Sequence, residues 1–135
     1  MPIPEKLPLF RKLYAFTVCA HRSIHNMPRE YRYTLGAEMA RISWQCLDLM
    51  VLASYAEKEL KRKKISDLSD QFDRLNLRVR LMQELNIISA GQFAHWQENY
   101  LLEIGCEIGG WSRWAASRQT GQVELGEKDR EGGGD

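Results

Sequence analysis

The chain is organised around residues 103–111, Glu103-Ile104-Gly105-Cys106-Glu107-Ile108-Gly109-Gly110-Trp111. Three glycines interrupt what otherwise has the pattern of a helix, and each interior glycine costs roughly 1 kcal/mol relative to alanine. Gly105 and Gly109 share one helical face, where a second backbone can approach closely. The two isoleucines and Trp111 form an apolar ridge beside that face. We therefore expect a helix held by close packing, and the alternative is a helix that frays here.

The charges are distributed unevenly along the 135 residues, a length that fits one domain. Residues 1–118 contain 17 basic and 13 acidic residues, a net charge of +4. Residues 119–135 contain five acidic and two basic residues, a net charge of −3, together with five glycines. The near-neutral total of +1 therefore conceals a basic body. We predict that residues 119–135 form a disordered acidic, glycine-rich tail.

The cysteines and the hydrophobic segments indicate the cellular location. Cys19, Cys46 and Cys106 each lie in an apolar, helix-periodic segment without the short spacings of metal sites, which predicts reduced cysteines in the core. The N-terminal residues do not have the pattern of a signal peptide. No segment approaches the roughly 20 uninterrupted apolar residues of a membrane span. We expect a cytoplasmic protein that does not contact a membrane.

Apolar residues recur every three or four positions in four segments, which predicts an all-α protein. Asn26-Met27-Pro28 separates the first two helices, and Ser89 with Gln92 forms a capping-box signature before the last. The expected helices cover about residues 5–25, 29–62, 67–86 and 90–117. Short connections favour an antiparallel up-down-up-down four-helix bundle over residues 1–118.

Two helices have more apolar surface than one neighbour would cover. In the second helix, Trp44, Leu47, Val51 and Tyr55 form an apolar stripe beside the main one, so its second neighbour layer is expected to be another subunit. In the third helix, the core stripe is predicted to be widened by Leu77, Leu81, Leu85 and Ile88. We assign Gly105, Gly109, Gly110 and Trp111 a structural role within the bundle or between subunits.

The basic residues concentrate in the middle of the chain. Residues 57–64 hold five cations and two acids, a pattern typical of a solvated loop or helix end and also of a phosphate-contacting patch. Arg74 and Arg78 share a helical face, and Arg80 lies on another side.

Catalytic motifs are absent from the sequence. No Glu-x-x-His pair of a bundle-core metal enzyme occurs, and no glycine-rich phosphate loop. His21 and His25 have the spacing to share a metal ion, but no carboxylate is placed to join them, and two cations at a helix C-terminus are the simpler interpretation. We expect no enzyme, no cofactor and no metal.

Two motifs resemble a known family. Met27-Pro28-Arg29-Glu30-Tyr31-Arg32-Tyr33-Thr34-Leu35-Gly36 resembles the first motif of the four-helix-bundle family that includes the accessory variability determinant of diversity-generating retroelements. Residues 103–111 resemble the hallmark of that family's last helix. Both motifs occur in the right order and spacing, and the resemblance covers roughly Leu7 to Arg118.

The resemblance implies a non-enzymatic protein that assembles as a homopentameric ring. It implies binding of the retroelement's reverse transcriptase and of nucleic acid, either template RNA or cDNA, in support of mutagenic retrohoming. Arg29, Arg32 and Arg80 match basic positions of the family. The candidate contact residues are Arg29, Arg32, Lys61, Arg62, Lys63, Lys64, Arg74, Arg78 and Arg80.

The sequence also departs from the family. Asn76 and Cys106 stand where the family often has basic residues. Each lost cation removes about one phosphate contact, which makes polymerase binding the stronger expectation than nucleic-acid binding. The alternative is a protein-only four-helix-bundle interaction module related to the ribosomal-RNA intervening-sequence protein.

Overall fold

The computed structural model describes the backbone of residues 3–130 and the side chains of residues 3–117. Within this range all regular structure is helical, and no strand occurs. The segments are α1 (Pro8–Ser23), the 3₁₀ turn η1 (Ile24–Asn26), α2 (Arg29–Tyr31), the π-helical η2 (Arg32–Gly36), α3 (Ala37–Tyr55), α4 (Lys58–Glu84), α5 (Ala90–Trp96), the π-helical η3 (Gln97–Leu101) and α6 (Leu102–Arg130).

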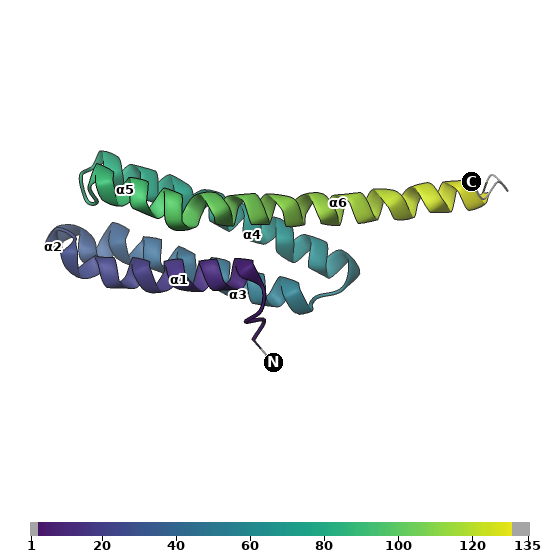
Figure 1. Cartoon of the computed structure of the whole chain (residues 1–135), viewed down its shortest axis with the longest axis horizontal. Helices are drawn as coiled ribbons and strands as arrows, with labels where there is room; N and C mark the ends of the chain where they lie inside the picture. The colour runs from purple at the N-terminus through teal and green to yellow at the C-terminus, as the bar shows by residue number, and fades with distance from the viewer. Residues whose placement is uncertain (1–2, 131–135) are drawn as a thin grey trace.

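These segments combine into the four helical rods that the sequence predicts for the described residues, because η2 joins α2 to α3 and η3 joins α5 to α6. The α3 helix packs against α1 and α4, and α6 packs against α4 and α1. The α1–α3 and α4–α5 connections lie at one end of the bundle, here called the α2 end (Figure 1). The α3–α4 connection lies at the other, here called the α3–α4 end. The prediction of an all-α helical bundle is confirmed.

The core lies between the rods and consists of the apolar stripes expected from the sequence. Leu13 and Phe16 of α1 are fully buried, and the ring of Phe16 meets Trp96 edge-on at 5.5 Å between centroids. Pro8 occupies the first turn of α1, where its missing N–H costs nothing. The predicted cap is also present, because the Ser89 hydroxyl accepts a hydrogen bond from the backbone N–H of Gln92 at 3.0 Å.

The second stripe of the third helix was predicted wrongly except for Ile88, which is buried in the core. Leu77, Leu81 and Leu85 do not widen the core but are 62%, 42% and 45% exposed. The α4 helix packs against α3 and α6 on one side, where Leu75, Val79 and other core residues point. The three leucines recur at intervals of four and form an apolar surface stripe, whose first member, Leu77, also lines the groove between α4 and the α5–α6 rod.

The break between the second and third helices also differs from the prediction. The α3 helix ends at Tyr55 rather than near residue 62, and α4 begins at Lys58 rather than near residue 67. Ala56 and Glu57 are extended, and Lys58 has a φ of 52°. No glycine or proline marks this turn in the sequence. The charged run 57–64 is therefore mostly the first turns of α4.

The C-terminal boundary differs as well. The backbone of α6 continues to Arg130, past the predicted end of the bundle near residue 118. Residues 119–130 lack proline, and extending an existing helix avoids the cost of nucleation, which offsets the poor helix propensity of Gly121 and Gly126. Residues 131–135 of the predicted tail lie outside the described residues. Disorder of the tail in solution stays a prediction.

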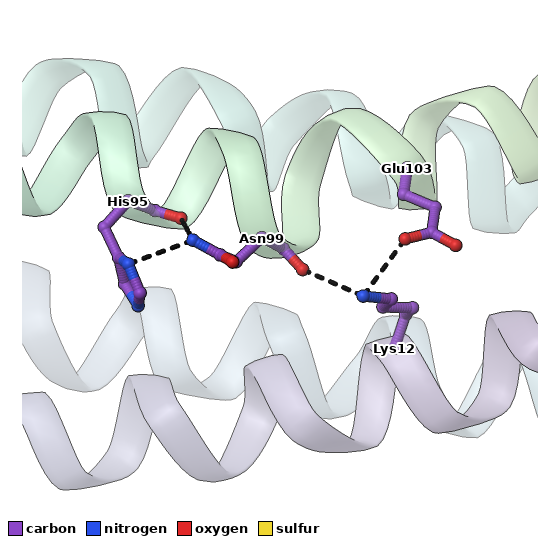
Figure 2. Close-up of polar contacts among 4 residues, drawn as sticks. All are labelled: Lys12, His95, Asn99 and Glu103. Atoms are coloured by element: carbon purple, nitrogen blue, oxygen red, sulfur yellow. Dashed lines mark hydrogen bonds and ion pairs between the residues drawn. The ribbon is translucent and has the colours of Figure 1, made fainter.

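A lysine of α1 holds the π-helical segment η3 in place (Figure 2). The Lys12 ammonium donates to the carbonyl oxygen of Asn99 at 3.1 Å and forms an ion pair with Glu103 at 3.0 Å. The side-chain Nδ2 of Asn99 donates to the backbone carbonyl oxygen of His95 at 2.8 Å. The same nitrogen contacts the His95 Nδ1 at 2.9 Å. The change from α to π hydrogen bonding displaces carbonyl groups from their usual partners, and these side chains satisfy two of them.

Gly105 confirms part of the close-packing expectation. A Cβ at this position would lie 3.3 Å from Cε2 of Phe72 on α4. The group that approaches Gly105 is thus an aromatic ring, whereas the sequence predicted a second backbone. Gly109 and Gly110 instead face Arg113 of their own helix.

Candidate nucleic-acid interface

The nine predicted cations do not form one patch. All except Arg29 and Arg32 lie on α4, whose 27 residues span about 40 Å at roughly 1.5 Å per residue. Residues 61–64 occupy the α3–α4 end, while Arg29 and Arg32 lie at the α2 end (Figure 1). Arg74, Arg78 and Arg80 form a separate group in the second half of α4.

Lys61 points inward from the first group. Its ammonium donates to the carbonyl oxygens of Ser54 and Ala56 at 3.3 and 3.4 Å, at the C-terminus of α3. A lysine in this position satisfies carbonyls that the end of a helix leaves unpaired. Lys61 is half-buried, so it joins α4 to α3 rather than facing solvent.

Of the three cations that follow Lys61, Arg62 and Lys63 are exposed and Lys64 is half-buried. Arg62 pairs with Glu59 at 2.6 Å and Lys63 with Asp67 at 3.4 Å, both within α4 and with largely exposed side chains. Such surface pairs contribute at most about 1 kcal/mol. Lys64 has no ion pair among the described side chains. Phosphate groups can therefore replace these weak local pairings.

The first half of α6 places Trp111 beside Lys61. The Lys61 ammonium lies 5.9 Å from the centroid of the Trp111 ring. Trp114, three residues further along α6, is 44% exposed. Aromatic rings beside cations are the arrangement on which single-stranded bases stack.

Arg113 adds a cation that the sequence analysis missed. A Cβ at Gly109 would lie 3.3 Å from one terminal nitrogen of Arg113, and a Cβ at Gly110 would lie 3.8 Å from the other. The two glycines thus leave room for the guanidinium to lie along the helix. The sequence could have indicated this placement, because Gly109 and Gly110 stand four and three residues before Arg113. Positions with these separations meet on one face of a helix. We call Arg62, Lys63, Lys64 and Arg113, with Trp111 and Trp114, the basic end cluster.

The arginines of the second half of α4 divide between two sides, as predicted. Arg78 reaches toward α3, where its Nε donates to Glu38 Oε1 at 3.0 Å. Arg80 lies on the other side and lines a groove of about 900 Å³ between α4 and the α5–α6 rod. Leu77 and Leu102 line the same groove. Arg78 is therefore partly neutralised, while Arg80 shares its groove with Asp73 and Glu84 as well as with the leucines.

The two arginines of the first motif also differ from each other. The Nε of Arg32 donates to the carbonyl oxygen of Met27 at 3.0 Å, which ties η2 to the preceding turn. Arg29 is fully on the surface. Only Arg29 of this pair is placed to meet an anion without first giving up a hydrogen bond to the backbone.

The cysteines differ in environment. Burial raises the pKa of Cys46 to about 12, and it also raises the pKa of the half-buried Cys19. Cys106 is exposed and lines the groove that contains Arg80, so the prediction of a core position was wrong for this residue. It follows the ridge residue Ile104 by two positions, which turns it away from the core.

No three His, Cys, Asp or Glu side chains gather to hold a metal ion within the described part of the chain. Among the described residues, no helix is both long and apolar enough to span a membrane.

Comparison with known proteins identifies the family. A family model described as bAvd-like matches residues 8–115, which include both sequence motifs, the first three rods and the last rod as far as residue 115. No curated protein and no solved structure matches the chain. The match covers most of the sequence and agrees with the helical bundle of the structure. The chain belongs to the bAvd-like family.

Proposed function

We propose that this protein is a non-enzymatic, cytoplasmic accessory factor of a diversity-generating retroelement. It binds the reverse transcriptase and template RNA or cDNA, and thereby supports mutagenic retrohoming. Membership of the bAvd-like family supports the accessory role. Contact with nucleic acid and polymerase is our inference from the charged surface.

The contact between Lys61 and Trp111 carries the nucleic-acid part of the proposal. It brings the first turns of α4 against α6, so that cations from two helices and two tryptophans share one end of the bundle. Phosphate groups would meet the cations, and bases would stack on the rings. This site is sequence-independent, because none of its contacts requires a particular base edge.

We also propose that the four rods follow an up-down-up-down topology. Five copies of this bundle then assemble as a homopentameric ring. The second apolar stripe of α3 supports assembly, because Trp44 is 56% and Tyr55 44% exposed, while Val51 is half-buried. Large aromatic side chains on one helical face are typical of protein contacts. Light scattering should give a molar mass five times that of the chain. The molar mass of a monomer would contradict the ring.

Copurification tests the accessory role. The tagged protein is coexpressed with the reverse transcriptase of its own locus, with and without template RNA. We expect the polymerase to copurify in both cases and the RNA to be enriched. Recovery of neither would contradict the proposal.

A protein-only interaction module is the second candidate. The exposed leucine stripe of α4, Leu77, Leu81 and Leu85, favours it because an apolar row of this kind fits another protein and not a phosphate chain. Capture of the polymerase without any RNA affinity would decide for this alternative.

A further inference from the structure

The groove of about 900 Å³ between α4 and the α5–α6 rod contains three side-chain amides in its lining. Asn76 and Gln83 come from α4 and Gln97 comes from η3, and all three are half-buried. None of these side chains forms a hydrogen bond with another group among the described residues. Each amide has two N–H donors and a carbonyl acceptor, so the groove holds a set of accessible, unused hydrogen-bonding groups. We call it the amide groove.

The amides have the spacing to pair with an extended backbone. Asn76 and Gln83 share one face of α4 and are separated by two turns, about 10 Å at roughly 1.5 Å per residue. Three residues of an extended chain span the same distance at about 3.3 Å per residue. A side-chain amide pairs well with a peptide group, because each has a donor and an acceptor. An extended segment has its peptide groups free, whereas a helix satisfies them internally, so the amides favour an extended ligand.

Three exposed charged residues of α4 also line the amide groove. Glu84, Arg80 and Asp73 follow one another at intervals of about 6 and 10 Å along the helix. None of them has an ion pair among the described side chains. Side chains on one face of an extended chain recur roughly every 7 Å, so a base, an acid and a base at alternate positions would face these three residues in turn. Two acids against one base disfavour a phosphate chain.

The wall opposite α4 is apolar at the surface. Leu102 of α6 lines the amide groove and is 60% exposed, and the half-buried Phe93 of α5 lies in the same lining. Because extended side chains alternate between two faces, the residues between the charged ones would point toward this wall. Aliphatic side chains at those positions would remove Leu102 from water.

We propose that the amide groove binds an extended segment of a partner protein that has a base, an apolar residue, an acid, an apolar residue and a base in that order. The amides pair with the backbone of the segment, the charged side chains meet those of α4, and the apolar side chains cover Leu102. This inference goes beyond the proposed function. It assigns a second surface, away from the basic end cluster, that requires no RNA and is the same whichever protein supplies the segment.

The probe is the peptide acetyl-Lys-Leu-Glu-Leu-Lys-amide, whose charge pattern is the same in both chain directions. It is titrated into the full chain by calorimetry, and we expect saturable binding. The peptide acetyl-Glu-Leu-Lys-Leu-Glu-amide has the same length and leucines with opposite charges, and it should bind at least about fivefold more weakly. N-methylation of both leucines removes their N–H donors and should also weaken binding by about fivefold or more. The parent protein is used for all three peptides, so these comparisons do not depend on the folding of a variant.

Cys106 shows whether the peptide occupies the amide groove. This cysteine is exposed and lines the groove, whereas Cys46 is buried in the core. The peptide should protect Cys106 from alkylation by iodoacetamide in proportion to the bound fraction. Binding without any protection of Cys106 would place the peptide elsewhere and overturn the proposal.

Variants test the amides. Gln83→Met and Gln97→Met remove an amide with little change of shape, and each should weaken peptide binding about fivefold, the effect of one net hydrogen bond. Gln71→Met is the matched control, because Gln71 is a half-buried residue of α4 outside the groove, and it should leave affinity unchanged.

Several results would overturn the proposal: no saturable binding, equal affinities for the two charge patterns, or equal losses in Gln71→Met. It would also be overturned if the groove variants changed RNA affinity or the molar mass of the protein without changing peptide affinity. The groove would then belong to nucleic acid or to a contact between copies of the chain.

Discussion

Gly36 lies directly against Met27: a Cβ at position 36 would stand 2.8 Å from the Met27 sulfur and 3.1 Å from the carbonyl oxygen of Tyr31. Met27 is only 2% exposed and belongs to the hydrophobic core. This contact folds the first family motif back on itself at the π-helical segment η2. It explains why glycine, a poor helix former, occupies the position.

Gly36→Ala should therefore destabilise the protein by about 1–3 kcal/mol through overpacking. Gly91→Ala is the matched control, because a Cβ there meets only the Ser89 hydroxyl at 3.9 Å. That change should stabilise α5 by up to about 1 kcal/mol. Urea denaturation of both variants checks the pair, and two changes of the same sign would contradict the packing account.

The ion pair between Arg78 and Glu38 should contribute to stability rather than to RNA binding alone. Both side chains are partly exposed, so we expect a coupling energy of about 0.5–1 kcal/mol from a double-mutant cycle with Arg78→Gln and Glu38→Gln. Arg80→Gln should change stability by less than about 0.5 kcal/mol. A coupling energy of zero would show that the ion pair with Glu38 does not stabilise the fold.

Glu107 should make stability depend on pH. Burial, assisted by the charge of Glu103 and opposed by Lys12, raises its pKa. A raised pKa means that the folded state holds the proton more tightly, so the contribution of Glu107 to stability is present at low pH and is lost as pH rises through the folded pKa. Glu107→Gln is neutral throughout and should raise Tm at about pH 7 but not at about pH 4. Equal Tm differences at both pH values would contradict this assignment.

The cysteines should react in a fixed order. Cys106 is exposed, whereas Cys46 is buried with a pKa raised to about 12, so almost none of it is thiolate near neutral pH. An aromatic disulfide reagent should label Cys106 rapidly in the native protein and Cys46 only on unfolding. Rapid native labelling of Cys46, identified by peptide mass, would show that this part of the core opens.

Periodicity was sufficient to predict the four rods and most of the core, because stripes such as Leu9, Leu13 and Phe16 follow from helical geometry alone. The turn at Ala56 and Glu57 could not be predicted, since it depends on Lys61 satisfying the end of α3 and not on a local breaker. The side of α4 that faces solvent depends on which helices become its neighbours. These neighbours are a tertiary property that the local sequence pattern does not reveal. For this reason the predicted core positions of Leu77, Leu81 and Leu85 were wrong.

The candidate site was predictable only as a set of cations. Sequence spacing placed Arg74 and Arg78 on one face, but it did not show that Glu38 would neutralise Arg78. It also did not show that Trp111 lies beside Lys61, because these residues are far apart in the chain. The hallmark glycines were expected to admit another helix, whereas Gly109 and Gly110 accommodate Arg113.

The salt dependence of RNA binding tests the basic end cluster most directly. The affinity of the full chain for a structured RNA is measured over a series of salt concentrations. The double variant Arg62→Gln, Lys63→Gln is compared with Arg22→Gln, Arg41→Gln, which removes the same charge from exposed positions away from this end of the bundle. We predict that the cluster variant loses affinity and that the magnitude of its slope of log K against log salt falls by about 2, while the control keeps both the affinity and the slope. An affinity of the parent protein that does not respond to salt, or equal losses in the two variants, would contradict nucleic-acid binding at this end of the bundle.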